Sequence, residues 1–173
     1  MVRMKVLFIY SGSILWFLLL IPGAAVLAGR FLDRLFGWPR LPLRWVAYPA
    51  GVILVLAGLS FIKAAWLNLL RIGWGHPQEA FGYPLLPPTQ RLVMNGPYAY
   101  TRNPMVLGFL CYLLGILFCI RSLSALLLLY PLIWALAVFY LKKMEEPHLI
   151  RRFGQEYLDY RKRVSFLIPR VPD

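Results

Sequence analysis

Three short polar segments of this sequence carry the side chains that could do chemistry. The first reads Gly96-Pro97-Tyr98-Ala99-Tyr100-Thr101-Arg102-Asn103-Pro104-Met105-Val106-Leu107-Gly108. Gly-Pro is a turn signal, and Asn103-Pro104 is typical of an N-cap followed by proline at the first helical position. The pattern predicts a helix N-terminus, whose free amides and dipole favour an anion, beside the charge of Arg102. Arg102 could hold a carboxylate in a fork or, as the simpler alternative, bind lipid phosphate.

The second segment, Lys142-Lys143-Met144-Glu145-Glu146-Pro147-His148-Leu149, follows the last apolar run. Neighbouring positions on a helix point about 100° apart, so Glu145 and Glu146 can face different partners. Carboxylates at a membrane boundary are costly when unpaired. They either meet a cation of a ligand or form a solvated face with the two preceding lysines. Pro147 cannot continue regular helical bonding and is expected to bend the chain.

The third segment, residues 148–164, has the pattern of an amphipathic surface helix. Its apolar positions recur every three or four residues: Leu149, Phe153, Tyr157, Tyr160 and Val164. Such a helix with basic flanks normally lies in the plane of the lipid headgroups. Anchoring explains the apolar stripe, but it explains less well the hydroxyls of Tyr157 and Tyr160 and the neighbouring Arg163. These three residues are therefore candidate site residues.

The composition shows what kind of scaffold must position these segments. The chain has 173 residues, of which 60% are hydrophobic and 15% charged, with a mean hydropathy of +0.64. Soluble domains carry roughly 25% charged residues, so this chain has too little polar surface to face water on all sides. Four apolar runs stand out, at 6–28, 45–70, 105–120 and 122–141. We expect an all-α, multi-pass transmembrane bundle of about four spans, with a C-terminal amphipathic helix at the interface. The first run also fits a cleavable signal peptide.

These runs predict one membrane domain over 1–173. It would comprise two N-terminal spans (1–70), a loop (71–104), a tight helical hairpin (105–141) and a C-terminal helix and tail (142–173). Five of the 19 Lys and Arg residues would lie on one membrane face and the other fourteen on the opposite face. The five are Arg30, Arg34, Arg40, Arg44 and Arg121. The positive-inside rule then places both termini and the loop in the cytoplasm, in a protein of the inner or plasma membrane.

The net charge of +12 is dispersed along an apolar chain, which favours the lipid bilayer as partner and argues against nucleic acid. Cys111 and Cys119 would lie about 12 Å apart along one helix, too far for a disulfide. With two cysteines and two histidines, we expect no metal site.

Taken in order, the polar segments resemble the isoprenylcysteine carboxyl methyltransferase-like family of integral-membrane methyltransferases, related to the phospholipid N-methyltransferases. The resemblance covers about Leu86–Arg170. It rests on the following residues: Pro87-Pro88, Leu92-Val93, Gly96 to Gly108, Glu145-Glu146-Pro147, Phe153-Gly154-Gln155-Glu156-Tyr157, Tyr160 and Pro169-Arg170. It implies S-adenosylmethionine as methyl donor, bound on the cytosolic side between the loop and the helix after the hairpin.

The resemblance also implies roles for individual residues. Glu145 or Glu146 suits the ammonium of the donor, and Arg102 suits its carboxylate. Backbone groups of Asn103, Pro104, Met105, Leu107 and Gly108 suit the adenine end, and the rings of Tyr98 or Tyr157 suit the sulfonium. Arg163 could orient a carboxylate acceptor, whereas an amine or thiol acceptor would make Glu146 or Tyr160 the candidate base. The family signature Arg-His-Pro-x-Tyr-x-Gly is changed here, with Asn103 and Val106 in the His and Tyr positions.

The predicted function is methylation of a lipidic or amphipathic acceptor that enters from the bilayer. Three alternatives stay open: a phospholipid amine N-methyltransferase, a membrane reductase that uses NADPH, and a non-enzymatic transport or assembly module. NADPH would require more arginine near the loop than Arg91 and Arg102 supply. A transporter would require charges at mid-span, and the spans offer only Lys63 near one end.

Overall fold

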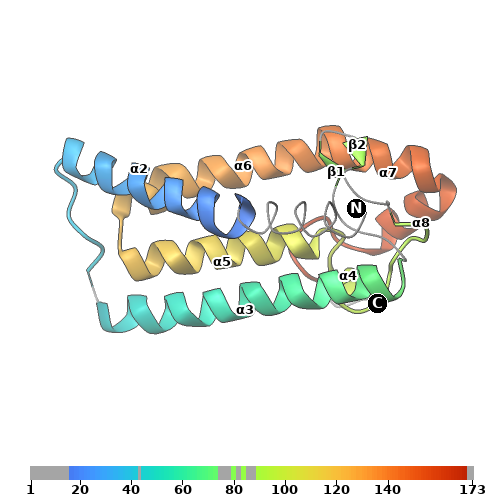
Figure 1. Cartoon of the computed structure of the whole chain (residues 1–173), viewed down its shortest axis with the longest axis horizontal. Helices are drawn as coiled ribbons and strands as arrows, with labels where there is room; N and C mark the ends of the chain where they lie inside the picture. The colour runs from blue at the N-terminus through green and yellow to red at the C-terminus, as the bar shows by residue number, and fades with distance from the viewer. Residues whose placement is uncertain (1–15, 43, 74–78, 81–82, 85–88, 171–173) are drawn as a thin grey trace, which may run out of the picture. The chain divides into compact units, whose positions relative to one another are not determined.

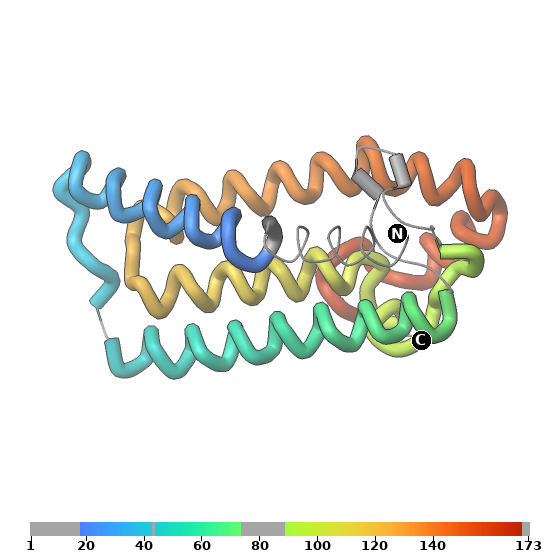
Figure 2. The backbone as a smooth tube through the Cα atoms, in the orientation of Figure 1, coloured from blue at the N-terminus to red at the C-terminus, as the bar shows by residue number. Residues whose placement is uncertain are grey.

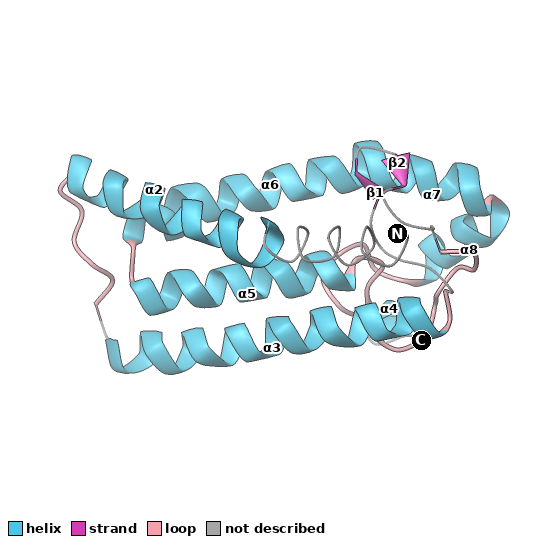
Figure 3. Ribbon diagram, in the orientation of Figure 1, coloured by secondary structure: helices cyan, strands magenta, loops and turns pink. Residues whose placement is uncertain are grey.

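The computed structural model describes residues 16–42, 44–73, 79–80, 83–84 and 89–170. This part of the chain is almost wholly helical, as expected (Figure 3). Its strands are the two-residue β1 (Glu79–Ala80) and β2 (Tyr83–Pro84), which pair antiparallel. Much of the first apolar run and of the 71–104 loop lies outside the described residues.

Figure 1 shows the order of the helices, which are joined by short connections except between α3 and α4, where residues 72–96 intervene. In order they are η1 (Trp16–Leu20), α2 (Ile21–Leu35), α3 (Arg44–Arg71), α4 (Pro97–Tyr100), α5 (Pro104–Ile120), η2 (Ala125–Leu129), α6 (Tyr130–Tyr140), η3 (Leu141–Glu145), α7 (Glu146–Phe153) and α8 (Gln155–Arg163), where η marks a π-helical turn. Two helical runs among the described residues, α3 and the continuous Ala125–Phe153, are long and apolar enough to cross a membrane, and α5 is a shorter apolar helix. The all-helical membrane architecture is confirmed, and the described residues contain two to three such helices; residues 6–15 of the first predicted span lie outside them.

The chain forms two compact units. Unit 1 comprises Met1–Leu59 and Phe109–Ala135, and unit 2 comprises Ser60–Gly108 and Leu136–Asp173. The core of unit 1 is built from buried Ala25, Leu113, Leu117 and Ala125, where α2 lies along η2. α3 and α5 meet at Gly51 and Gly115. A Cβ on Gly115 would lie 2.5 Å from the Gly51 carbonyl oxygen, so the two backbones approach too closely for a larger residue.

The sequence predicts a tight hairpin over 105–141, and in unit 1 the chain turns sharply between the two apolar runs of that range. α5 ends at Ile120, and Arg121 reverses the chain with a positive φ of 62°. Two hydrogen bonds hold this non-glycine turn: the Leu41 amide donates to the Arg121 carbonyl over 3.0 Å, and Arg121 Nε donates to the Leu41 carbonyl over 2.7 Å. The next helix begins under a cap from α2, where Asp33 Oδ1 accepts the Ser124 amide at 2.8 Å.

The predicted bend at Pro147 is wrong. The chain stays helical from Ala125 to Phe153, and the π-helical turn η3 precedes α7. A π turn shifts the hydrogen-bonding register, so Pro147 falls in the first turn of α7, where a missing N–H is tolerated. The break comes instead at Gly154, whose φ of 56° and ψ of −129° suit only glycine. The single helix predicted over 148–164 is therefore two helices, α7 and α8.

Candidate functional site

The site in unit 2 begins with the turn that leads into α5. Gly96 opens it with a φ of 62° and a ψ of −132°, and the short helix α4 follows. A Cβ on Gly96 would lie 2.7 Å from Nδ2 of Asn68. Glycine is thus required here twice, for the backbone conformation and for the close approach to α3.

The segment after α8 clamps this turn. The Arg102 amide donates to the Ser165 carbonyl over 2.9 Å, and the Arg170 amide donates to the Tyr100 carbonyl over 3.1 Å. Figure 2 shows the red C-terminal tube running beside the yellow-green segment that enters α5. Thr101 is fully buried, and its hydroxyl donates to the Phe166 carbonyl over 3.3 Å. Residues more than sixty positions apart thereby fix the backbone on either side of Arg102.

Asn103 lies at the predicted N-cap position, but its side chain forms a hydrogen bond to a different segment. Its carbonyl accepts the first helical bond, from the Leu107 amide at 3.0 Å, so the position of the helix start is confirmed. The side-chain Nδ2, however, donates to the Phe166 carbonyl over 2.8 Å. Asn103 is only 8% exposed, and it joins the start of α5 to the clamp rather than capping the helix through its side chain.

Arg102 and Glu146 form the charged centre of unit 2. Arg102 Nη1 lies 2.5 Å from Glu146 Oε1, and the two side chains are 10% and 13% exposed. The guanidinium carbon also lies 5.5 Å from the centre of the Phe166 ring, within cation–π range. The Nε–H of Arg102 is buried and donates to no acceptor among the described residues. The arginine and the glutamate expected to bind opposite charges of a ligand are therefore paired with each other.

Two tyrosines, Tyr157 and Tyr160, interact electrostatically with Arg102, and a third, Tyr98, interacts with Tyr160 and Glu145. Tyr157 and Tyr160 are 2% and 3% exposed, and their ring centres lie 6.0 Å apart. Burial, together with the charge of Glu146, raises the pKa of Tyr157 to about 12, although Arg102 acts in the opposite direction. Burial and the charge of Glu145 raise the pKa of Tyr98. All three hydroxyls stay protonated at neutral pH, so they act as neutral dipoles.

Tyr160 does not fit the predicted role of a base. Its hydroxyl donates to the Tyr98 carbonyl over 2.7 Å, and burial raises its pKa. A buried phenol with a raised pKa, whose hydroxyl donates a hydrogen bond to a carbonyl, is a poor general base. Tyr160 positions the α4 turn instead.

Arg163 is not brought to this cluster. It is exposed at the end of α8, and its Nε donates over 3.4 Å to the Asp159 carbonyl of the same helix. The role predicted for it, orienting a carboxylate acceptor, has no support in this geometry.

The remaining predicted residues lie beside the pair on two helices. Glu145 ends η3, is half-buried, and acts electrostatically on Tyr98 and Tyr157. At the start of α5, Pro104 and Gly108 are buried, whereas Met105 and Leu107 are half-buried.

Sequence reasoning missed Thr101, Phe166 and Lys142 as parts of the site. Phe166 offers its carbonyl to Thr101 and Asn103, and its ring lies 5.5 Å from Arg102 and 5.3 Å from Lys142 Nζ. Because every residue has a carbonyl, no residue pattern marks this one.

Comparison with known proteins agrees with the resemblance seen in the sequence. The rat protein-S-isoprenylcysteine O-methyltransferase (Rattus norvegicus) is 30% identical over 148 residues, which cover 81% of this chain and 47% of the rat protein. The enzyme of the same name from Schizosaccharomyces pombe is 35% identical over 83 residues, covering 47% of this chain and 34% of its own length. The chain thus spans about half or less of the length of these curated relatives.

A solved structure shares the fold. It is that of a eukaryotic intramembrane Ras methyltransferase, isoprenylcysteine carboxyl methyltransferase, with a TM-score of 0.60 and 22% identity. The similarity covers 87% of this chain and 52% of that one. The profile of the family described as phospholipid methyltransferase matches residues 46–156, well over half of the sequence. The chain therefore belongs to the phospholipid methyltransferase family, and it is an integral-membrane member whose relatives include the isoprenylcysteine O-methyltransferases.

Proposed function

We propose that this chain is a membrane methyltransferase that uses S-adenosylmethionine and methylates the carboxylate of a lipidic, isoprenylcysteine-like acceptor. The observation that carries the proposal is the nearly buried Arg102–Glu146 pair, with Tyr157 beside both charges and the Phe166 ring beside Arg102. The names of the relatives support both the reaction and the acceptor class.

The residues at the pair fit the amino-acid end of the donor. That end carries a carboxylate and an ammonium close together, and the pair presents a guanidinium and a carboxylate close together. The buried Nε–H of Arg102 still needs an acceptor, and a carboxylate bound in a fork supplies one. Glu145 adds a second negative charge next to the pair, so the ammonium can be held while Glu146 keeps its contact with Arg102.

When bound, S-adenosylmethionine supplies an electrophilic methyl group on a positively charged sulfonium. The residues of this chain would bind the donor and orient its methyl group towards the acceptor. The neutral rings of Tyr98 and Tyr157 present π faces to a cation. The clamp from Ser165 to Arg170 keeps the Arg102 turn fixed and covers it from water, and positioning of this kind supplies much of the rate in a direct displacement.

A carboxylate acceptor suits this site better than an amine. A carboxylate is already ionised at neutral pH and requires no base. An amine must lose a proton, yet the tyrosines have raised pKa values and Glu146 is engaged with Arg102. The name of the matching family keeps phospholipid amines as the second candidate acceptor.

The test is calorimetric titration of the full chain in detergent with S-adenosylmethionine. We expect binding by the wild type and its loss in Glu145→Gln/Glu146→Gln. A control variant is Glu156→Gln, which removes one exposed carboxylate of α8 and should bind like the wild type. No binding by folded wild-type protein would overturn the proposal, and displacement by NADPH would favour a reductase.

The acceptor is then tested with labelled donor. We expect label in a farnesylated cysteine with a free carboxylate and none in its methyl ester. Label in phosphatidylethanolamine alone would replace the carboxylate by an amine as the acceptor.

A further inference from the structure

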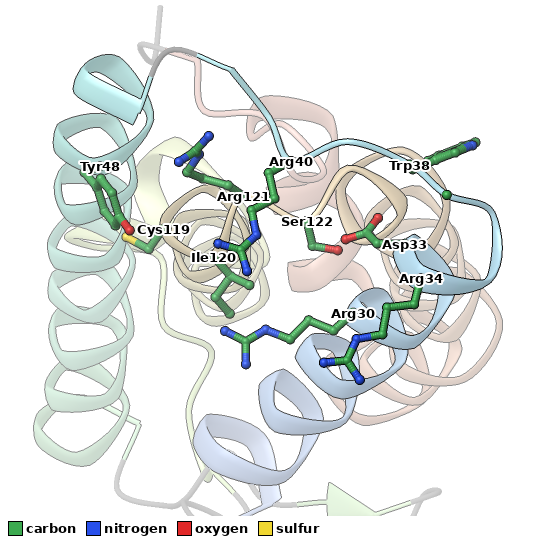
Figure 4. A pocket seen from close by; sticks show the side chains of 11 residues that line it. Arg30, Asp33, Arg34, Trp38, Arg40, Tyr48, Cys119, Ile120, Arg121 and Ser122 are labelled. Carbon is green, nitrogen blue, oxygen red and sulfur yellow. The ribbon is translucent and has the colours of Figure 1, made fainter.

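A second group of charges lies in unit 1, around a cavity of about 610 Å³. The end of α2, the connection that follows it, the start of α3 and the turn after α5 enclose this cavity (Figure 4). Four arginines line it: Arg30, Arg34, Arg40 and Arg121. Asp33 is the one acidic residue in its lining. We call it the arginine pocket.

The arginines of this pocket lack counter-charges within the described part of the chain. The guanidinium groups of Arg30, Arg34 and Arg40 are exposed and take part in no hydrogen bond or ion pair there. In Figure 4, the side chain of Arg40 lies above those of Ile120 and Ser122, and the side chains of Arg30 and Arg34 lie below them, around the same opening. Arg121 uses its Nε on the Leu41 carbonyl, which fixes the direction of its side chain.

Asp33 does not neutralise them, because it is already engaged. Its Oδ1 accepts the Ser124 amide at 2.8 Å. Burial alone would raise the pKa of Asp33, but hydrogen bonds from Ser122 and Ser124 lower it. Asp33 thus serves as an ionised helix cap, and the pocket keeps a surplus of positive charge.

These arginines are clustered around one cavity, whereas ordinary surface charges would be spread over the face. The topology predicted from the positive-inside rule puts five Lys or Arg residues on one membrane face, and four of these five line this one cavity. Like charges held close together repel unless an anion joins them. A guanidinium fork matches the oxygens of a phosphate group, and several such forks around one cavity form a phosphate site.

We propose that the arginine pocket binds a phosphate group, and that its natural source is the headgroup of an anionic phospholipid. The cavity is of the size that takes a whole headgroup, since small-molecule sites range over about 300–1,000 Å³. Trp38 and Tyr48 in its lining are residues that favour the membrane interface, which is where a headgroup lies.

The test uses the delipidated full chain in neutral detergent and native mass spectrometry. Phosphatidylglycerol and phosphatidylcholine are added in separate arms. Inorganic phosphate and glycerol 3-phosphate are titrated with intrinsic tryptophan fluorescence, to which Trp38 of the pocket contributes, as readout. The pocket variant is Arg30→Gln/Arg34→Gln/Arg40→Gln. The matched control is Arg71→Gln/Arg151→Gln/Arg161→Gln, which removes the same charge from exposed positions of unit 2.

We expect phosphatidylglycerol to bind the wild type and the control, and to bind the pocket variant at least about tenfold more weakly. Lysine at the same three positions should restore part of the affinity, because it keeps the charge but loses the fork. Equal affinity of both lipids, or equal weakening in pocket variant and control, would overturn the proposal. Binding of inorganic phosphate that is as tight as that of the lipid would replace the lipid by a soluble phosphate as the source. Circular dichroism and thermal unfolding of each variant show whether a loss comes from the pocket or from the fold.

Discussion

The Nη1 atom of Arg102 lies 2.5 Å from Oε1 of Glu146, although 44 positions separate the two residues in sequence. One residue precedes α5 and the other begins α7, so the hairpin between them brings the two polar segments together. Both side chains are nearly buried, at 10% and 13% exposed. Removing one partner of such a pair leaves an uncompensated buried charge. The resulting loss of folding free energy is larger than the net contribution of the pair itself.

Exchanging the two residues separates stability from binding. Arg102→Gln and Glu146→Gln should each lower the free energy of unfolding by about 1–3 kcal/mol, because each leaves its partner uncompensated. The swapped variant Arg102→Glu/Glu146→Arg restores opposite charges and should recover much of that loss. It should not recover affinity for S-adenosylmethionine, because both charges now stand in the wrong place. Denaturant unfolding and calorimetric titration measure the two effects. Recovery of both properties would contradict a role of the pair in binding.

Asn103 should tolerate only side chains that can donate to the Phe166 carbonyl. Asn103→Asp has nearly the same shape but accepts only, so it sets a carboxylate against a carbonyl at about the present 2.8 Å separation. We expect a loss of about 1–3 kcal/mol for Asp. Asn103→His, the residue of the family signature, keeps a donor and should lose less. Unfolding curves of the two variants give the order directly, and equal losses would show that the hydrogen bond is unimportant.

Gly96 and Gly154 provide a matched pair of glycines. Their backbone angles are nearly the same, with φ of 62° and 56° and ψ of −132° and −129°. A Cβ on Gly96 meets Asn68 at 2.7 Å, whereas one on Gly154 meets nothing within 4 Å. Gly154→Ala should therefore show only the backbone strain, about 1–3 kcal/mol, and Gly96→Ala should lose more. Asn68→Ala in the Gly96→Ala background should remove the extra loss. Equal losses in the two single variants would argue against the close approach.

The pKa of Tyr157 gives the protein a stability limit at high pH. The folded-state pKa of about 12 lies above the ordinary value of 10.0, so the folded protein holds this proton more tightly than the unfolded chain does. The resulting contribution to stability is complete below pH 10 and is lost as the pH rises from 10 towards 12. Tyr157→Phe should show a smaller fall in unfolding midpoint over this range than the wild type. The same slope in both proteins would assign the fall to other groups.

The membrane class, the helical architecture, the start of α5 and the turn between the last two apolar runs could all be predicted from the sequence. Each depends on local properties: the length of an apolar run, the Asn103-Pro104 pair, or the single Arg121 between two runs. Hydropathy and turn chemistry act over a few residues, so they can be seen in the order of residue types.

Tertiary structure decided which polar groups meet. It paired Arg102 with Glu146, turned Asn103 towards a backbone carbonyl, left Arg163 on the surface, and engaged the Tyr160 hydroxyl with Tyr98. It also brought four arginines together around one cavity, whereas the sequence showed them only as four of the five basic residues predicted on one membrane face. These outcomes depend on contacts between distant segments and on carbonyl acceptors, which every residue has, so no spacing of residue types could reveal them.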